Sequence, residues 1–67
     1  MTNFEQRILA TVNPMLAKNE TASFFENSGT LFLNCGLVTL NKVTRALKEI
    51  SNIDVNAVGG EFSIDFV

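Results

Sequence analysis

The sequence predicts a single α+β domain spanning residues 1–67, in the order helix, hairpin, helix, hairpin. Two stretches repeat apolar residues at helical spacing, and two others alternate apolar and polar residues around glycine-containing turns. Because each of these four elements has one apolar side, the simplest packing has two layers. We expect a four-stranded, mostly antiparallel sheet with both helices on one face, and the pattern leaves the strand order open.

The first helix is predicted over residues 3–18. Residues 2–5 read TNFE, which fits a capping box in which Thr2 caps the helix and Glu5 reaches back. Apolar residues then follow at helical spacing: Phe4, Ile8 and Val12. Because Pro14 has no amide hydrogen and disfavours helical geometry at the residue before it, we expect the helix to kink or split at Asn13.

The first hairpin, residues 22–35, contains the adjacent residues Phe24 and Phe25, which have to point to opposite faces of a strand. A three-residue loop turns Phe25 inward and leaves Phe24 on the outer face beside Phe32. A two-residue loop exchanges the two phenylalanines and still leaves Phe32 outside. We favour the three-residue loop because it also directs Glu26 outward.

The second helix is predicted over residues 39–52, with Thr39 as a plausible cap. Four apolar residues fall within one narrow arc of this helix: Leu40, Val43, Leu47 and Ile50. Three of the five basic residues of the chain lie away from that arc: Lys42, Arg45 and Lys48.

The second hairpin has the clearest register, because its strands flank Gly59-Gly60, a pair suited to a tight primed turn. Counting outward from this turn aligns three apolar pairs on one face, which we expect to be buried: Ala57 with Phe62, Val55 with Ile64, and Ile53 with Phe66. On the opposite face the same register places Asp54 directly across from Asp65.

Composition argues against catalysis and favours association. The 67 residues include one cysteine and no histidine, which excludes an internal disulfide and the usual four-ligand zinc site. Cys35 falls on the inward face beside leucines, so we predict a structural thiol and no catalytic, cofactor-binding or metal-binding residues. A domain this small buries only about 60% of its unfolded surface, and pairing with another chain is a common remedy.

The predicted protein interface consists of Phe24, Phe32, Asp54 and Asp65, on the sheet face away from the second helix. Two large rings there favour a contact surface, although exposed aromatic residues also occur without a function. The two aspartates are interpreted as solvated acids, as contacts for a basic partner or, least favoured, as part of a cation site. The alternative surface, for nucleic acid, consists of Lys42, Arg45 and Lys48, but Glu49 interrupts it.

These features predict a small non-enzymatic protein-binding module that works through its sheet face or a free strand edge and that also forms a homodimer. Its size, its net charge of −2 and its apparently complete sequence are typical of a phage or mobile-element protein that inhibits or redirects a larger host protein. A small nucleic-acid-binding regulator is the alternative, and the weak charge disfavours it. The absence of a secretory signal and of a long apolar run predicts a cytoplasmic protein without membrane contact.

Overall fold

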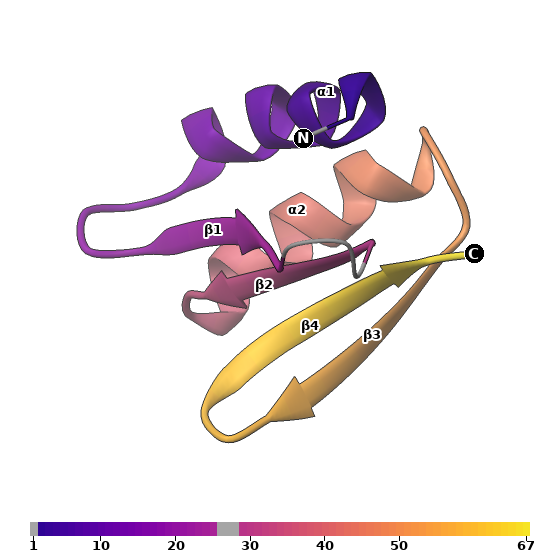
Figure 1. Cartoon of the computed structure of the whole chain (residues 1–67). Coiled ribbons are helices and arrows are strands. Elements are labelled where there is room, and N and C mark those ends of the chain that lie inside the picture. The colour runs from indigo at the N-terminus through magenta and orange to yellow at the C-terminus, as the bar shows by residue number, and fades with distance from the viewer. Residues whose placement is uncertain (1, 26–28) are drawn as a thin grey trace.

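The computed structural model describes residues 2–25 and 29–67. Its elements in chain order are α1 (Asn3–Val12), the 3-10 helix η1 (Asn13–Met15), β1 (Thr21–Phe24), β2 (Thr30–Asn34), α2 (Leu37–Lys48), β3 (Ile53–Val58) and β4 (Glu61–Phe66) (Figure 1). The chain is therefore a small α+β domain with two helices and a four-stranded antiparallel sheet, which confirms the predicted class. Within the described ranges, neither helix has the length and apolar character needed to cross a lipid bilayer.

The first helix begins as its sequence predicts but ends earlier. The hydroxyl of Thr2 accepts the amide of Glu5 at 3.1 Å, and the carboxylate of Glu5 accepts the amide of Thr2 at 2.9 Å, which confirms the capping box. The α-helix stops at Val12, and the segment containing Pro14 continues as a single 3-10 turn. The predicted split at Asn13 is confirmed, whereas residues 16–18, the end of the predicted helix, lie outside α1 and η1.

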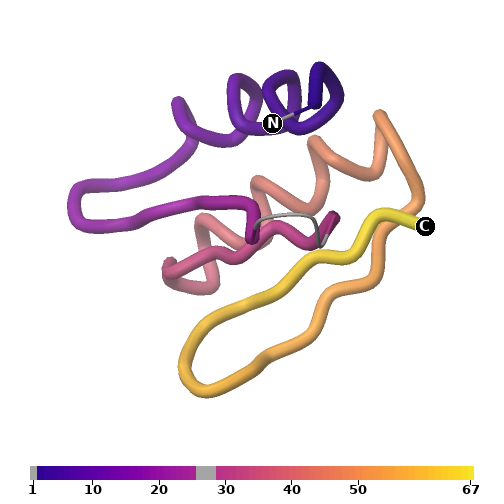
Figure 2. Tube along the Cα trace, viewed as in Figure 1, coloured from indigo at the N-terminus to yellow at the C-terminus, as the bar shows by residue number. Residues whose placement is uncertain are grey.

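The last strand of the sheet in chain order, β4, lies between β2 and β3. The strand order is β1-β2-β4-β3, and β4 pairs antiparallel with both of its neighbours. As a result, β2 and β3 run parallel to each other on either side of β4, and α2 connects them. Figure 2 shows this path, with the yellow C-terminal strand passing between the magenta and orange segments.

The hydrophobic core joins both helices to the two central strands. Its most deeply buried side chains are Ile8, Val12, Leu31, Leu33, Leu40, Val43, Leu47 and Ile64. Three aromatic rings extend this core at one end. The ring of Phe66 lies 5.3 Å from that of Phe4 in an edge-on arrangement, and 5.9 Å from that of Phe24.

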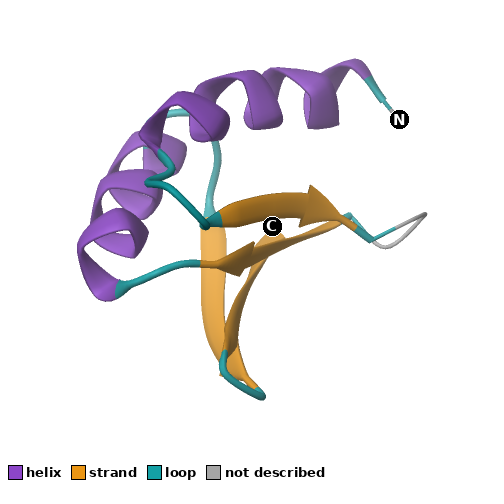
Figure 3. Ribbon diagram, turned by 90° about the vertical axis from the view of Figure 1, so that its left-hand side faces the viewer, coloured by secondary structure: helices purple, strands orange, loops and turns teal. Residues whose placement is uncertain are grey.

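The second hairpin has the predicted register but not the predicted burial. All six pairs between β3 and β4 match the expectation, and Gly59 and Gly60 have φ angles of +56° and +83°, as a type I′ turn requires. On the inward face Ile64 is fully buried, but its cross-strand neighbour Val55 is 39% exposed and Ala57 is exposed as well. The reason is visible in Figure 3, where this hairpin extends away from the helices.

The favoured register of the first hairpin was wrong by one residue. Phe24 pairs with Leu31, and the amide of Phe25 donates to the carbonyl of Thr30, so Phe24 faces inward and Phe25 faces outward. This is the second of the two registers that the sequence allows. Phe24 completes the aromatic cluster with Phe66, a contact that the pattern of the hairpin alone does not contain. The expected outward position of Glu26 falls among residues 26–28, outside the described residues.

The second helix begins two residues earlier than predicted, and its cap comes from elsewhere in the chain. Gly36 occupies the cap position, and Thr39 is buried in the first turn. The carboxylate of Glu20 accepts the amide of Gly36 at 2.9 Å, the hydroxyl of Thr39 at 2.6 Å and the amide of Ala17 at 2.7 Å. Thr39 is therefore not the cap, and a carboxylate from the segment before β1 supplies the missing acceptor. The helix ends at Lys48, before the predicted end at residue 52.

Candidate interaction surface

The side of the sheet opposite Leu31, Leu33 and Ile64, which we call the outer face, presents two rows of side chains. Strand alternation and the observed registers define both rows. The first row reads Phe25, Thr30, Asp65, Asp54 from β1 to β3, and the second reads Ser23, Phe32, Ser63, Asn56. The aromatic residues thus occupy the half of the outer face nearest β1, and the carboxylates occupy the half nearest β3.

The aromatic half is built from Phe25 and Phe32, which contact each other. Their ring centroids lie 6.1 Å apart with an interplanar angle of 72°, an edge-to-face arrangement. Phe32 is half-buried, and its neighbour in the row, Ser63, is only 7% exposed. Phe25, by contrast, is 66% exposed. The ring of Phe25 therefore packs against Phe32 and is exposed to the solvent on the face opposite the core.

The acidic half contains Asp54 and Asp65 directly opposite each other, as the sequence predicts. The hydroxyl of Thr30 donates to Asp65 at 2.6 Å, which gives this carboxylate a fixed neighbour in the first row. Like charges at directly opposed positions destabilise a sheet, so a cationic group placed between them would be stabilising. In the part of the chain that the structure describes, no three metal-ligating side chains gather in one place.

Three of the four residues predicted for the protein interface share this face: Phe32, Asp54 and Asp65. The fourth, Phe24, does not, because the register turns its ring into the core beside Phe66. Phe25 takes its place on the outer face. Sequence reasoning missed Phe25 because the assignment depended on the loop length, for which the chain gives no decisive signal.

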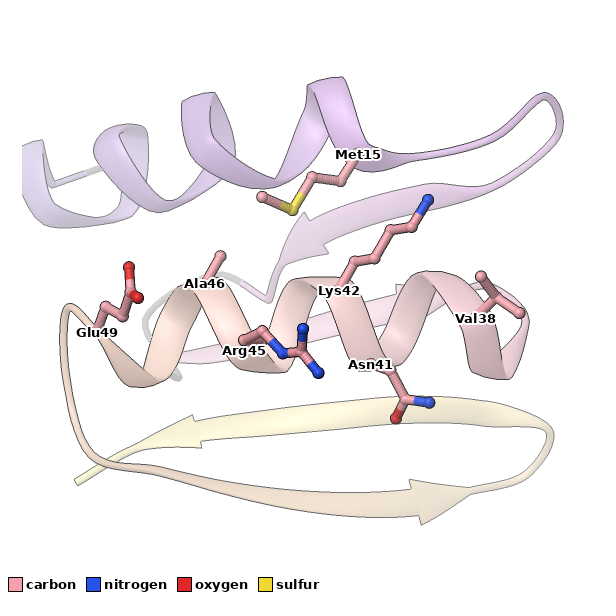
Figure 4. Close-up of a pocket in the computed structure, with 7 residues that line it drawn as sticks. All are labelled: Met15, Val38, Asn41, Lys42, Arg45, Ala46 and Glu49. Carbon is pink, nitrogen blue, oxygen red and sulfur yellow. The ribbon is translucent and has the colours of Figure 1, made fainter.

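The basic residues proposed for nucleic acid lie on α2 and not on the outer face. Lys42 and Arg45 line an open groove of about 520 Å³ together with Met15, Val38, Asn41, Ala46 and Glu49 (Figure 4). In that view Lys42 extends towards the segment after η1, whereas Arg45 points away from α1. Lys48 is exposed but is not part of the described lining of the groove. The three basic residues are thus not gathered in one site, and Glu49 adds a negative charge to the groove that Lys42 and Arg45 line.

Cys35 follows the end of β2, where it is half-buried and packs against the core. Burial raises the pKa of its thiol above the ordinary value, and the nearby Glu20 carboxylate raises this pKa further. The thiolate, which is the nucleophilic form, is therefore disfavoured at neutral pH. This environment is the opposite of the electropositive one that activates a catalytic cysteine.

Comparison with known proteins adds no relative to this description. No protein-family model, no curated protein and no solved structure gives a significant match to the chain.

Proposed function

We propose that this chain is a small non-enzymatic protein-binding module that contacts its partner through the outer face of its sheet. The observation that carries the proposal is the ring of Phe25, which is 66% exposed and packs edge-on against Phe32. We infer that both helices cover the other face, because their buried side chains join Leu31, Leu33 and Ile64 in one core cluster. The outer face is then the side of the sheet available for a contact.

The chemistry of this face indicates the kind of partner. A protein interface usually has an aromatic or apolar centre and a polar rim, and Phe25 with Phe32 supplies the first while Asp54 and Asp65 supply the second. We therefore propose a partner surface with an apolar pocket bordered by lysine or arginine. By analogy with small phage proteins of similar size, the partner is a larger cellular protein in the cytoplasm that the module inhibits or redirects.

The same arrangement disfavours the nucleic-acid alternative. The aspartates repel phosphates at the face that carries the exposed ring, so Phe25 and Phe32 are poorly placed to stack on bases. The basic residues Lys42 and Arg45 lie on α2, beside Glu49 and away from these rings. Binding of DNA or RNA that weakens steeply with salt and is lost with K42E/R45E would favour the alternative over the proposal.

The test compares two single substitutions of exposed apolar residues, Phe25→Ser on the outer face and Val38→Ser on α2, where Val38 is 71% exposed. A partner isolated from the native cell with the wild-type chain is purified, and its affinity for each variant is measured by calorimetry. We expect V38S to bind like the wild type and F25S to bind about 30-fold more weakly, the effect of losing an aromatic hot spot of about 2 kcal/mol. The double variant F25S/F32S removes both rings of the outer face. If this double variant is folded and binds the partner as tightly as the wild type, the proposal is overturned.

A further inference from the structure

The strand β3 forms one edge of the sheet, and its backbone groups alternate between facing β4 and facing away. In the part of the chain that the structure describes, no strand lies beyond β3. The amide of Val67 donates to the carbonyl of Asn52 at 2.9 Å, so the backbone carbonyl of Asn52 points towards the β4 side of the strand. In an antiparallel pair, facing residues alternate between hydrogen-bonded and non-hydrogen-bonded positions. The N–H and C=O groups of Ile53, Val55 and Ala57 therefore point outward from the sheet edge.

This edge lacks most of the devices that usually prevent strand pairing. Natural sheets protect their edges with charged side chains, above all lysine, with proline, bulges or very short strands, or with a covering helix. The strand reads IDVNAV, with no lysine or proline and Asp54 as its one charged residue, and each of its six residues pairs one-to-one with β4, so it contains no bulge. The other edge, β1, is only four residues long and has α1 packed beside it.

The inward side of the same edge is apolar and incompletely covered. Val55 is 39% exposed and Ala57 is exposed, although both belong to the face that carries the buried Ile64. In Figures 1 and 3 the β3–β4 hairpin projects away from α1, so the far end of this face lies beyond the helices. A strand added at the edge would bring apolar side chains alongside Val55 and Ala57 and remove them from water.

The edge is complementary to itself. Two copies of β3 can run antiparallel about a two-fold axis that passes between Val55 and Val55 of the second copy. The three residues whose backbone groups point out of the edge, Ile53, Val55 and Ala57, then pair only with one another. Val55 then meets Val55 of the second copy, and Ile53 meets Ala57, all on the apolar side. On the outer face Asp54 meets Asn56, so no two carboxylates stand opposite each other across the junction. A second copy of the chain therefore pairs the free backbone groups of the edge, covers its apolar side chains, and brings no two carboxylates opposite each other.

We propose that the chain forms a two-fold symmetric dimer through antiparallel pairing of β3 with β3, centred on Val55. The dimer contains one continuous eight-stranded sheet, and the Phe25–Phe32 pair of each subunit lies at the opposite end of the outer face from the junction. An isologous contact of this kind closes on itself and uses the same strand from both subunits. The proposal does not depend on the outer face binding a partner.

The decisive experiment exploits the two-fold axis, which brings residue 55 next to its own copy. We expect the wild-type chain to sediment as a dimer, with an apparent melting temperature that rises with protein concentration. Both V55K and V55E place like charges together at the axis, so each should weaken the dimer about tenfold or more. An equimolar mixture of V55K and V55E should restore dimers, now containing one of each variant. As a matched control, V38K adds the same charge to an exposed residue of α2, outside β3, and should leave the dimer intact.

Three outcomes would overturn the inference. The first is a wild-type chain that remains monomeric up to about millimolar concentration. The second is a dimer that V55K and V55E leave unchanged. The third is a dimer that F25S abolishes while V55K does not, because this places the contact on the outer face. Circular dichroism of each variant checks that loss of the dimer is not loss of the fold. If V55K unfolds, V55T keeps a β-branched side chain without a charge and should keep the dimer.

Discussion

At the scale of single residues, Glu20 has the widest structural role of any side chain described above. Its carboxylate joins three parts of the chain: the turn at Ala17, the start of α2 at Gly36, and the buried hydroxyl of Thr39. Donors that favour the ionised form lower the pKa of this carboxyl below its usual value, with the amide of Gly36 contributing most and Lys42 adding a smaller electrostatic effect. The start of α2 therefore depends on a charge held by a distant residue.

We expect Glu20→Gln to lower the melting temperature at pH 7, because the amide replaces a charged acceptor and cannot match all three donors. The lowered pKa also gives a pH dependence. The stabilisation is complete above the unfolded-state pKa of about 4.5 and is lost as the pH falls through the lower folded-state pKa. Melting curves from pH 7 to pH 3 should thus converge for the wild type and E20Q. Glu49→Gln, at the other end of α2, serves as the control, and equal melting temperatures for E20Q and the wild type at pH 7 would contradict the assignment.

We also expect Cys35 to react slowly with a thiol reagent at neutral pH in the folded protein. Its raised pKa leaves little thiolate, and its packing against the core restricts access. Denaturant should accelerate the labelling strongly. A matched variant, C35A/L37C, moves the thiol to the first residue of α2, a position that is 68% exposed, and should react at least as fast as a free cysteine because a helix start favours the thiolate. Equal rates for the native wild type and this variant would show that Cys35 is more accessible than its position implies.

At the scale of elements, the β3–β4 hairpin divides into a buried half and an exposed half. Ile64 is fully buried, whereas its cross-strand partner Val55 is 39% exposed. Ile64→Ala should cost about 2–5 kcal/mol of unfolding free energy, because it removes core packing and leaves a cavity. Val55→Ala should cost less than about 1 kcal/mol, as expected for a smaller and partly solvated side chain. Urea titrations in dilute solution, where the chain is monomeric, measure both; similar costs would mean that the two positions are buried to the same extent.

The first hairpin provides a direct test of its register with two adjacent residues. Phe24 packs against Phe66 and faces Leu31, so Phe24→Ala should cost up to about 3 kcal/mol, the lower end of the range for a phenylalanine in a core. Phe25→Ala loses mainly a cross-strand ring contact, so it should cost less than about 1 kcal/mol. Urea unfolding of both variants gives the comparison. The reverse order of costs would restore the register that places Phe25 inside.

The contrast between the two hairpins shows which part of this fold could be predicted from sequence. The register of β3 with β4 was predictable, because the two-residue Gly59-Gly60 turn and the apolar pattern agree on a single alignment. In the first hairpin two alignments exchange Phe24 and Phe25, and the contact with Phe66 that distinguishes them joins residues far apart in the chain. The carboxylate of Glu20 at the start of α2 was missed for the same reason. The local sequence pattern predicted the helices and strands. Contacts between these elements determined the register of the first hairpin and the cap of α2.

At the scale of the whole molecule, the two proposed contacts lie at opposite ends of one sheet and should act independently. The ring of Phe25 belongs to the β1 end, and the strand edge around Val55 belongs to β3. We expect F25S to lose the partner and keep the dimer, and V55K to lose the dimer and keep partner binding to each monomer. Sedimentation and calorimetry on the same two proteins measure both properties. Loss of both functions in either variant, with the fold retained, would mean that the surfaces are coupled.

The position of β4 also determines when this protein can fold during its synthesis. Its residues leave the ribosome after every other strand of the sheet, yet both β2 and β3 need β4 as their neighbour. Until residues 61–66 emerge, β2 and β3 cannot join one sheet, and Leu31 and Leu33 lack their cross-strand partners Ile64 and Phe62. We therefore expect the nascent chain to remain accessible to proteases until β4 is available for pairing. We expect this strand to complete the sheet, because β4 pairs with both β2 and β3.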